Sequence, residues 1–258
     1  MPHPLQLTKP RPPPHQAAGV HRPHQRNTVN PTATITDLLA RLRPDSSPCL
    51  VWYGPEGERV ELSGHVVDNW VAKTANLLAE ELDAGEGTSV GLRMAPHWRS
   101  LVWVLAAWQA GATVRLDPTG PAPDVLVAAD PDQLTGDSTH QVLVAPGALQ
   151  LRWPGDVPDG TLDYAAEVRS YADIYLGVDS LAADGRALEY DGGDLTFAEL
   201  LGQPSPARNL LVPAQTAWPE VLRESLATWQ GGGTVVLVHA DVEVTERLLD
   251  SERVSDRL

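Results

Sequence analysis

The sequence of 258 residues is poor in reactive side chains, because it contains one cysteine, Cys49, and two lysines, Lys9 and Lys73. A single thiol excludes an intramolecular disulfide. It also excludes a zinc site built on cysteines, which takes at least two thiolates from one chain. Cys49 stands beside a strand-like run, so we expect it to be buried and inert.

The chain also has fewer basic than acidic residues, and it lacks long apolar runs. Its formal net charge is −15, which argues against a nucleic-acid ligand, because phosphates require a basic footprint. No run of 18 or more apolar residues occurs, so no membrane insertion is expected. With 42% hydrophobic residues, the composition is that of a globular protein, which we expect in the cytoplasm.

Residues 1–32 differ from the rest of the chain. They hold four basic residues and no acid, together with eight prolines and four histidines, which leaves −19 for the remainder. We expect a disordered basic tail, because few apolar residues are available to bury, and no signal-like apolar run is present. A translation start assigned too early explains such a tail, with the native start near Val29. An intact mass matching residues 1–258 from the natural host would contradict this.

Strand-like and helix-like segments alternate after the tail, which predicts an α/β fold. We expect two similar layered lobes with mixed, largely parallel sheets flanked by helices. The predicted domains are a first lobe at 33–130, a surface linker at 131–160 and a second lobe at 161–258. The expected helices include 34–43 opened by Thr34, 63–82 opened by Ser63, 97–110, 164–171, 196–201, 218–229 and 242–249.

An internal repeat supports two similar lobes. Leu105–Leu116 matches Leu226–Leu237 at a constant offset of 121, with eight of twelve positions identical. Paired half-sites are one interpretation. We favour a duplicated packing unit, in which Trp108 and Trp229 pack on a sheet while Gly111 and Gly232 allow a left-handed helix end.

Three tryptophans, Trp98, Trp103 and Trp108, fall on one predicted helix. Steps of five residues turn by about 140° around a helix axis, so the three side chains cannot face a single core. We therefore expect at least one of them at a lobe interface, a pocket rim or a partner surface. A fully buried set would contradict this expectation.

The remaining polar residues predict no catalytic residue, no metal site and no cofactor. His97 could act as a general base, but a surface role or a packing role at a helix start is favoured. The histidines beyond the tail lack the spacing typical of metal ligands. Asp130, Asp132 and Asp137 indicate a solvated acidic loop. Ser63 lacks a nucleophile-elbow sequence and suits a helix cap.

The packing and turn residues of several segments follow one known order. The segments are Val51-Trp-Tyr53, Glu61-Leu-Ser63, Asn69–Leu78, Gly85–Leu92, Leu105–Val114, Leu116-Asp-Pro118, Asn209–Pro213, Gly232–Val238 and Leu248–Val254. This order resembles the amino-terminal part of the adenylate-forming superfamily, which includes acyl-CoA synthetases and peptide-synthetase adenylation domains. It also resembles short actinobacterial-type proteins with this layout and no assigned activity. Such residues identify a fold more securely than an activity.

The resemblance implies a Ser/Thr/Gly-rich phosphate loop ending in Pro-Lys-Gly, which wraps ATP phosphates with backbone N–H groups. No such sequence occurs between about 160 and 205. The nearest glycine cluster is Asp191-Gly-Gly-Asp194, whose carboxylates would repel a triphosphate. The other cluster, Gly231-Gly-Gly-Thr234, falls at a helix end of the repeat.

The resemblance also implies a mobile carboxy-terminal lid that delivers a lysine to the reacting groups. The sequence ends at Leu258, before that domain would begin. Lys73 matches a packing helix of the family and Lys9 lies in the tail, so neither is expected to replace that lysine.

The leading hypothesis is a catalytically degenerate adenylate-forming-like protein that serves as a binding or regulatory module. The expected partners are an acyl or nucleotide small molecule and a protein. One alternative is acyl-CoA synthetase-type ligase activity completed by a separate chain. Another is a protein-interaction scaffold that uses exposed tryptophans. Pyrophosphate exchange with ATP, and calorimetry with ATP or acyl-CoA, separate the three hypotheses.

Overall fold

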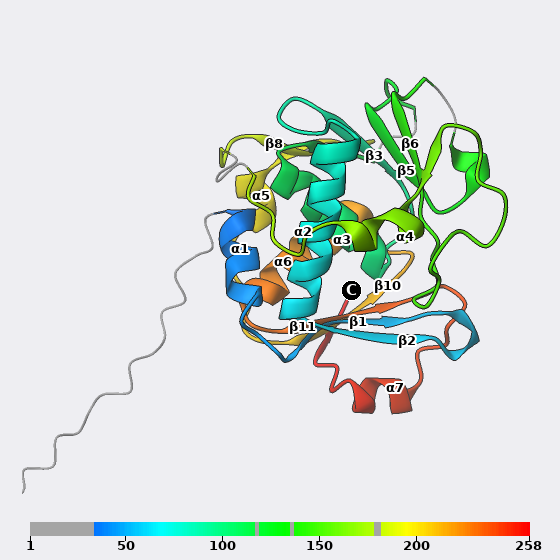
Figure 1. Ribbon diagram of the computed structural model, residues 1–258. Helices are drawn as coiled ribbons and strands as arrows, with labels where there is room; N and C mark the ends of the chain where they lie inside the picture. Colours follow the sequence, from blue (N-terminus) through cyan, green and yellow to red (C-terminus); the bar gives the residue numbers. More distant parts are fainter. Residues whose placement is uncertain (1–33, 117–118, 135–136, 178–181) are drawn as a thin grey trace, which may run out of the picture. The chain divides into compact units, whose positions relative to one another are not determined.

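The computed structural model describes residues 34–258, apart from 117–118, 135–136 and 178–181. Within these ranges the chain forms two β-sheets with helices packed between and around them (Figure 1). The predicted tail at 1–32 and the proposed start near Val29 lie outside the described residues. In the described part, no helix is long and apolar enough to cross a membrane.

The first sheet has five strands in the order β12-β10-β11-β1-β2. All neighbours are parallel except β1 and β2, which form a hairpin. Both faces are covered: Leu50 and Trp52 of β1 join the main core, whereas Val51 packs with α7 on the opposite face. The strands are β1 (Pro48–Tyr53), β2 (Arg59–Ser63), β10 (Asn209–Pro213), β11 (Thr234–Val238) and β12 (Asp256–Arg257).

The second sheet has seven strands in the order β7-β6-β5-β3-β4-β8-β9. It is parallel except for the β8–β9 hairpin. Parallel strands buried on both faces explain the continuous apolar runs in β5 and at the end of β6. The strands are β3 (Ser89–Arg93), β4 (Thr113–Arg115), β5 (Val125–Ala128), β6 (His140–Leu143), β7 (Thr161–Asp163), β8 (Arg186–Tyr190) and β9 (Gly193–Thr196).

The helices begin where the sequence predicts side-chain caps. The Oγ1 atom of Thr34 accepts the N–H of Asp37, and the Oγ atom of Ser63 accepts the N–H of Val66. The last helix begins later than expected, because Thr245 caps it. The helices are α1 (Ile35–Leu42), α2 (Gly64–Glu81), α3 (Trp98–Ala110), α4 (Tyr164–Glu167), α5 (Phe197–Leu201), α6 (Trp218–Gln230) and α7 (Glu246–Ser251), with short 3-10 turns η1 (Pro55–Gly57), η2 (Pro131–Gln133) and η3 (Val168–Ser170).

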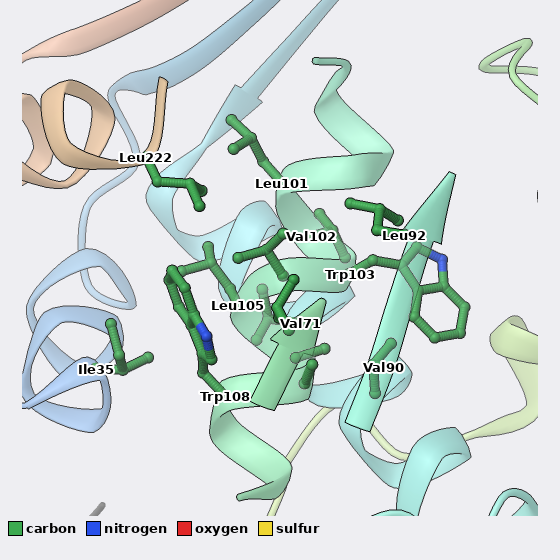
Figure 2. Packing of buried hydrophobic residues seen from close by; sticks show 14 of the residues in the cluster. Ile35, Val71, Val90, Leu92, Leu101, Val102, Trp103, Leu105, Trp108 and Leu222 are labelled. Atoms are coloured by element: carbon green, nitrogen blue, oxygen red, sulfur yellow. The ribbon is translucent and has the colours of Figure 1, made fainter. Parts of the chain in front are cut away.

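Helix α3 lies between the two sheets and is buried along its whole length. It contacts β1 of the first sheet, β4 of the second sheet and the neighbouring α2 (Figure 1). Trp103 and Trp108 point to different sides of the helix, with Trp103 toward Val90 and Leu92 of β3 (Figure 2). Such a helix has no solvent face, so its apolar side chains are not confined to one stripe.

The three tryptophans of this helix are the fully buried set that contradicts the expectation of one at a lobe interface, a pocket rim or a partner surface. Trp98, Trp103 and Trp108 are 2%, 1% and 0% exposed. The angular drift of the three side chains is real, but α3 has core on every side. Trp103 packs on Tyr164, with ring centroids 5.0 Å apart, and Trp108 packs on Phe197 at 5.8 Å.

The repeated segments form the same packing unit in both sheets. The indole N–H of Trp108 donates to the carbonyl of Ala187 at 2.7 Å, and that of Trp229 donates to the carbonyl of Cys49 at 2.8 Å. Both acceptors lie on the first strand of a hairpin beside the repeat's own strand. Gly111 and Gly232 have φ values of 96° and 78°, the predicted left-handed helix ends. The packing interpretation of the repeat is confirmed.

The predicted domain boundaries do not separate the two sheets, because the hairpins are exchanged between the repeats. β1 and β2 fall in 33–130 but join the sheet of β10 and β11. β8 and β9 fall in 161–258 but join β3 and β4. The range 131–160, expected as a surface linker, contributes the buried strand β6. Similarity of the two halves predicted two similar layers, but it carried no signal for which half supplies each hairpin.

Candidate functional site

A cavity of about 740 Å³ opens at the carboxyl ends of the parallel strands of the second sheet. Its walls come from the end of β3, the segments after β4 and β5, and the start of α6. The described lining residues are Leu92, Arg93, Met94, Ala95, Leu116, Gly120, Pro121, Ala122, Pro123, Leu126, Ala129, Asp130, Gln133 and Trp218. We call this cavity the crevice.

The topology of the second sheet explains where the crevice lies. From β3 the chain passes through α3 to β4 on one side, and then returns to β5 on the other side of β3. In open α/β sheets, ligands bind outside the carboxyl ends of strands at such a reversal. Gly91 of β3 permits the close packing there, because a Cβ would lie 2.5 Å from a carbon of Pro123.

The crevice is lined mostly by apolar side chains with few polar ones. Arg93, Asp130 and Gln133 are the polar side chains among the described lining residues. The side chain of Trp218 joins α6 to this wall, since its indole N–H donates to the Met94 carbonyl at 3.0 Å. The described lining contains no serine, threonine, cysteine or histidine, so it offers no such nucleophile. These features suit binding of a largely apolar molecule.

His97 caps α3, as the sequence analysis favoured. Its Nδ1 atom accepts the backbone N–H of Arg99 at 3.0 Å, and the backbone N–H of His97 donates to the Ser100 hydroxyl oxygen. The ring is 7% exposed and lies 4.4 Å from the ring centroid of Trp52. Burial, helped by the charges of Arg99 and His239, lowers the pKa of His97 to about 3. Such a histidine stays neutral and is a poor general base near neutral pH.

The glycine cluster nearest to the expected phosphate loop is a tight turn. Tyr190 and Gly193 pair across the β8–β9 hairpin, which leaves only Asp191 and Gly192 to connect the strands. Gly193, the first residue of β9, has a φ of 122°, a backbone conformation that favours glycine. The Asp194 carboxylate ion-pairs with Arg186 at 3.1 Å. Two connecting residues are too few to wrap a triphosphate in successive N–H groups.

The backbone N–H groups of the second glycine cluster are hydrogen-bonded to carbonyls at the end of α6. The N–H groups of Gly231, Gly232 and Gly233 donate to the carbonyls of Ala227, Trp229 and Thr228. A Cβ on Gly231 or Gly233 would lie 2.1 Å from a backbone oxygen. These glycines serve close packing and helix termination, and they leave no N–H group for a phosphate.

The other residues weighed in the sequence have structural positions. Cys49 is buried in β1, and burial raises the pKa of its thiol to about 12, so the thiolate nucleophile is scarce. Asp130 caps η2 by accepting the N–H of Asp132. Lys73 lies on α2 and its ammonium donates to the Tyr171 carbonyl. Lys9 lies outside the described residues. No group of three metal-ligating side chains occurs in the described ranges.

Sequence reasoning assigned no binding residue in the crevice, although a usable signal was present. Segments 89–92 and 125–128 read as strands in the sequence, and residues that follow neighbouring parallel strands meet at one edge of a sheet. Sequence reasoning also missed the hydrogen bond from the Trp218 indole to the Met94 carbonyl, because that contact depends on how the two sheets face each other.

The fold matches solved structures of adenylate-forming enzymes. The crystal structure of Brucella canis acyl-CoA synthetase aligns with a TM-score of 0.70 at 14% identity, covering 88% of this chain and 48% of that chain. The amino-terminal subdomain of Klebsiella oxytoca NpsA aligns with a TM-score of 0.59 at 15% identity, covering 86% and 59%. The chain has the fold of the amino-terminal part of adenylate-forming enzymes. It spans about half the length of the acyl-CoA synthetase.

A relative of similar extent is also known. The TIGR03089 family protein of Mycobacterium tuberculosis is 28% identical over 234 residues, which cover 87% of this chain and 96% of that protein. No family model matches the chain. The resemblance seen in the sequence is therefore confirmed at the level of the fold.

Proposed function

We propose that the protein is a catalytically degenerate relative of adenylate-forming enzymes that acts as a binding or regulatory module. The observation that carries this proposal is the β8–β9 turn. Where the family resemblance calls for a phosphate loop, Asp191 and Gly192 alone connect two paired strands. A cytoplasmic location is part of the proposal.

The crevice is the binding site in this proposal, and an acyl group is its ligand. Leu92, Met94, Leu116 and Leu126 offer apolar walls, and each buried methylene contributes about 0.8 kcal/mol. A volume of about 740 Å³ lies within the usual range for ligand sites.

Calorimetric titration with decanoate, decanoyl-CoA and ATP tests this assignment. We expect saturable binding of an acyl ligand and none of ATP. Ala129→Trp fills the crevice and should weaken acyl binding at least tenfold, whereas Ala166→Trp on the exposed side of α4 should leave it unchanged. Absence of acyl binding, or equal binding by both variants, would contradict the assignment.

Ligase activity completed by a separate chain is the second candidate. It is favoured by the match to about half of an acyl-CoA synthetase. A scaffold built on exposed tryptophans loses its basis, because all eight tryptophans lie in the described ranges and each is buried or half-buried. The two remaining candidates differ in whether ATP is bound and cleaved.

A further inference from the structure

A second cavity, separate from the crevice, lies beside helix α2. Its volume is about 180 Å³, roughly that of six water molecules at about 30 Å³ each. It is lined by Val66, Asn69, Trp70 and Lys73 of α2, and by Arg169 of η3. It shares no lining residue with the crevice.

Two cations line this cavity without a carboxylate partner. In the part of the chain that the structure describes, neither Lys73 nor Arg169 lies within 4.0 Å of a carboxylate oxygen. The Lys73 ammonium donates to the Tyr171 carbonyl, and Arg169 Nη1 donates to the Ala165 carbonyl at 2.9 Å. Both groups keep further N–H donors. In a chain of net charge −15, two unpaired cations at one cavity are an unusual concentration of positive charge.

A third cation lies behind the cavity wall. The guanidinium of Arg99 is 5.5 Å from the Trp70 ring centroid, and that of Arg169 is 6.0 Å from the same ring. Arg99 is 1% exposed, and its Nε and Nη1 atoms have no hydrogen-bond partner among the described residues. It donates through Nη2 to the Gly147 carbonyl and ion-pairs with no described carboxylate. Burial, with a contribution from the Arg169 charge, lowers the pKa of Arg99.

The acidic groups nearby do not cancel this charge by direct pairing. Glu81, Glu167 and Glu80 lie near the Tyr171 phenol and help to raise its pKa, after burial. The Glu58 carboxylate, which acts on Arg99 at longer range, accepts hydrogen bonds from the Ala148 N–H and the Trp52 indole. None of the four forms an ion pair with Lys73, Arg99 or Arg169 in the described structure.

We propose that this cavity binds a small organic carboxylate, with its oxygens on Lys73 and Arg169 and its apolar part on Trp70 and Val66. An arginine and a lysine match a carboxylate in charge, and charge-assisted hydrogen bonds are the stronger class. The half-buried Trp70 and Val66 supply apolar surface that a bare inorganic anion would leave unused. The volume admits a single ring or a short chain and excludes a nucleotide.

Calorimetric titration of the full chain with benzoate at low ionic strength tests the proposal, because salt screens exposed cations. We expect saturable binding that weakens about tenfold or more in Lys73→Gln and in Arg169→Gln. Arg247→Gln, which removes an exposed cation from α7, is the matched control and should bind as the parent does. Benzamide, the neutral analogue, should not bind.

Two further measurements keep the result decisive. Lys73→Arg keeps the charge and should retain binding within about threefold, even if Lys73→Gln folds poorly. Inorganic phosphate should bind more weakly than benzoate. Failure of benzoate to bind, equal binding by Arg169→Gln and Arg247→Gln, or phosphate binding as tight as benzoate would overturn the proposal. Because the crevice takes no part, the outcome is independent of the acyl-binding assignment.

Discussion

His97 illustrates how burial turns a titratable side chain into a structural one. The sequence favoured a role at a helix start, and the hydrogen bond from the Arg99 N–H to Nδ1 is that role. What the sequence could not supply was the packing of Trp52 of β1 against the ring, which requires the two sheets to face each other.

The depressed pKa of His97 predicts sensitivity to acid. The unfolded chain takes up the proton near the ordinary pKa of 6.5, whereas the folded protein resists it until about 3. The contribution of the neutral His97 ring to the free energy of unfolding is therefore fully present above pH 6.5. It is lost as the pH falls below that value, at up to about 1.4 kcal/mol per pH unit. Urea unfolding between pH 7 and 4 should show a steeper loss for the parent than for His97→Asn, which keeps a helix cap. Parallel pH profiles would contradict this.

The two repeat tryptophans predict a matched pair of stability losses. Trp108→Phe and Trp229→Phe each leave a buried carbonyl without its donor, on Ala187 and Cys49, which costs about 1–3 kcal/mol. Denaturant unfolding measures the loss. Trp153→Phe, half-buried and outside the repeat, serves as the control and should cost less. A negligible cost at either repeat position would contradict the equivalence of the two units.

At the scale of elements, helix ends and strand cores were predictable because their signals are local. Ser63, Thr34 and the repeat glycines specify their turns through their own backbone and near neighbours. The pairing of β1 with β11 was not predictable, since it joins strands more than 180 residues apart. The sequence analysis did not predict the short strands β7, β9 and β12, because two to four residues carry little periodicity.

Alanine substitutions at the two glycines that end α6 should lower the free energy of unfolding by different amounts and for different reasons. Gly232 has a φ of 78° and open space around a Cβ, so Gly232→Ala should cost about 1–2 kcal/mol from backbone strain alone. Gly231 has an ordinary φ of −79°, but a Cβ would lie 2.1 Å from the Ser205 carbonyl oxygen. Gly231→Ala should therefore be the more destabilising change in thermal unfolding. The reverse order would show that the contact with Ser205 is not tight.

At the scale of the whole molecule, exchange of the hairpins makes the two halves interdependent. A fragment covering 33–130 keeps β1 and β2 but loses β11, the parallel neighbour of β1. A fragment covering 161–258 keeps β8 but loses β4. We expect each fragment alone to lack cooperative unfolding and native near-ultraviolet circular dichroism. Cooperative folding of either one would contradict the exchange.

We propose that this chain lacks adenylation activity, because a two-residue turn joins β8 to β9 where a phosphate loop is expected. The most direct measurement is ATP–pyrophosphate exchange by the purified chain, with magnesium and a panel of fatty and aromatic acids. We expect no exchange above a protein-free control with any acid. Acid-dependent exchange that copurifies with the chain would contradict it, and would establish an enzyme that handles ATP without the expected loop.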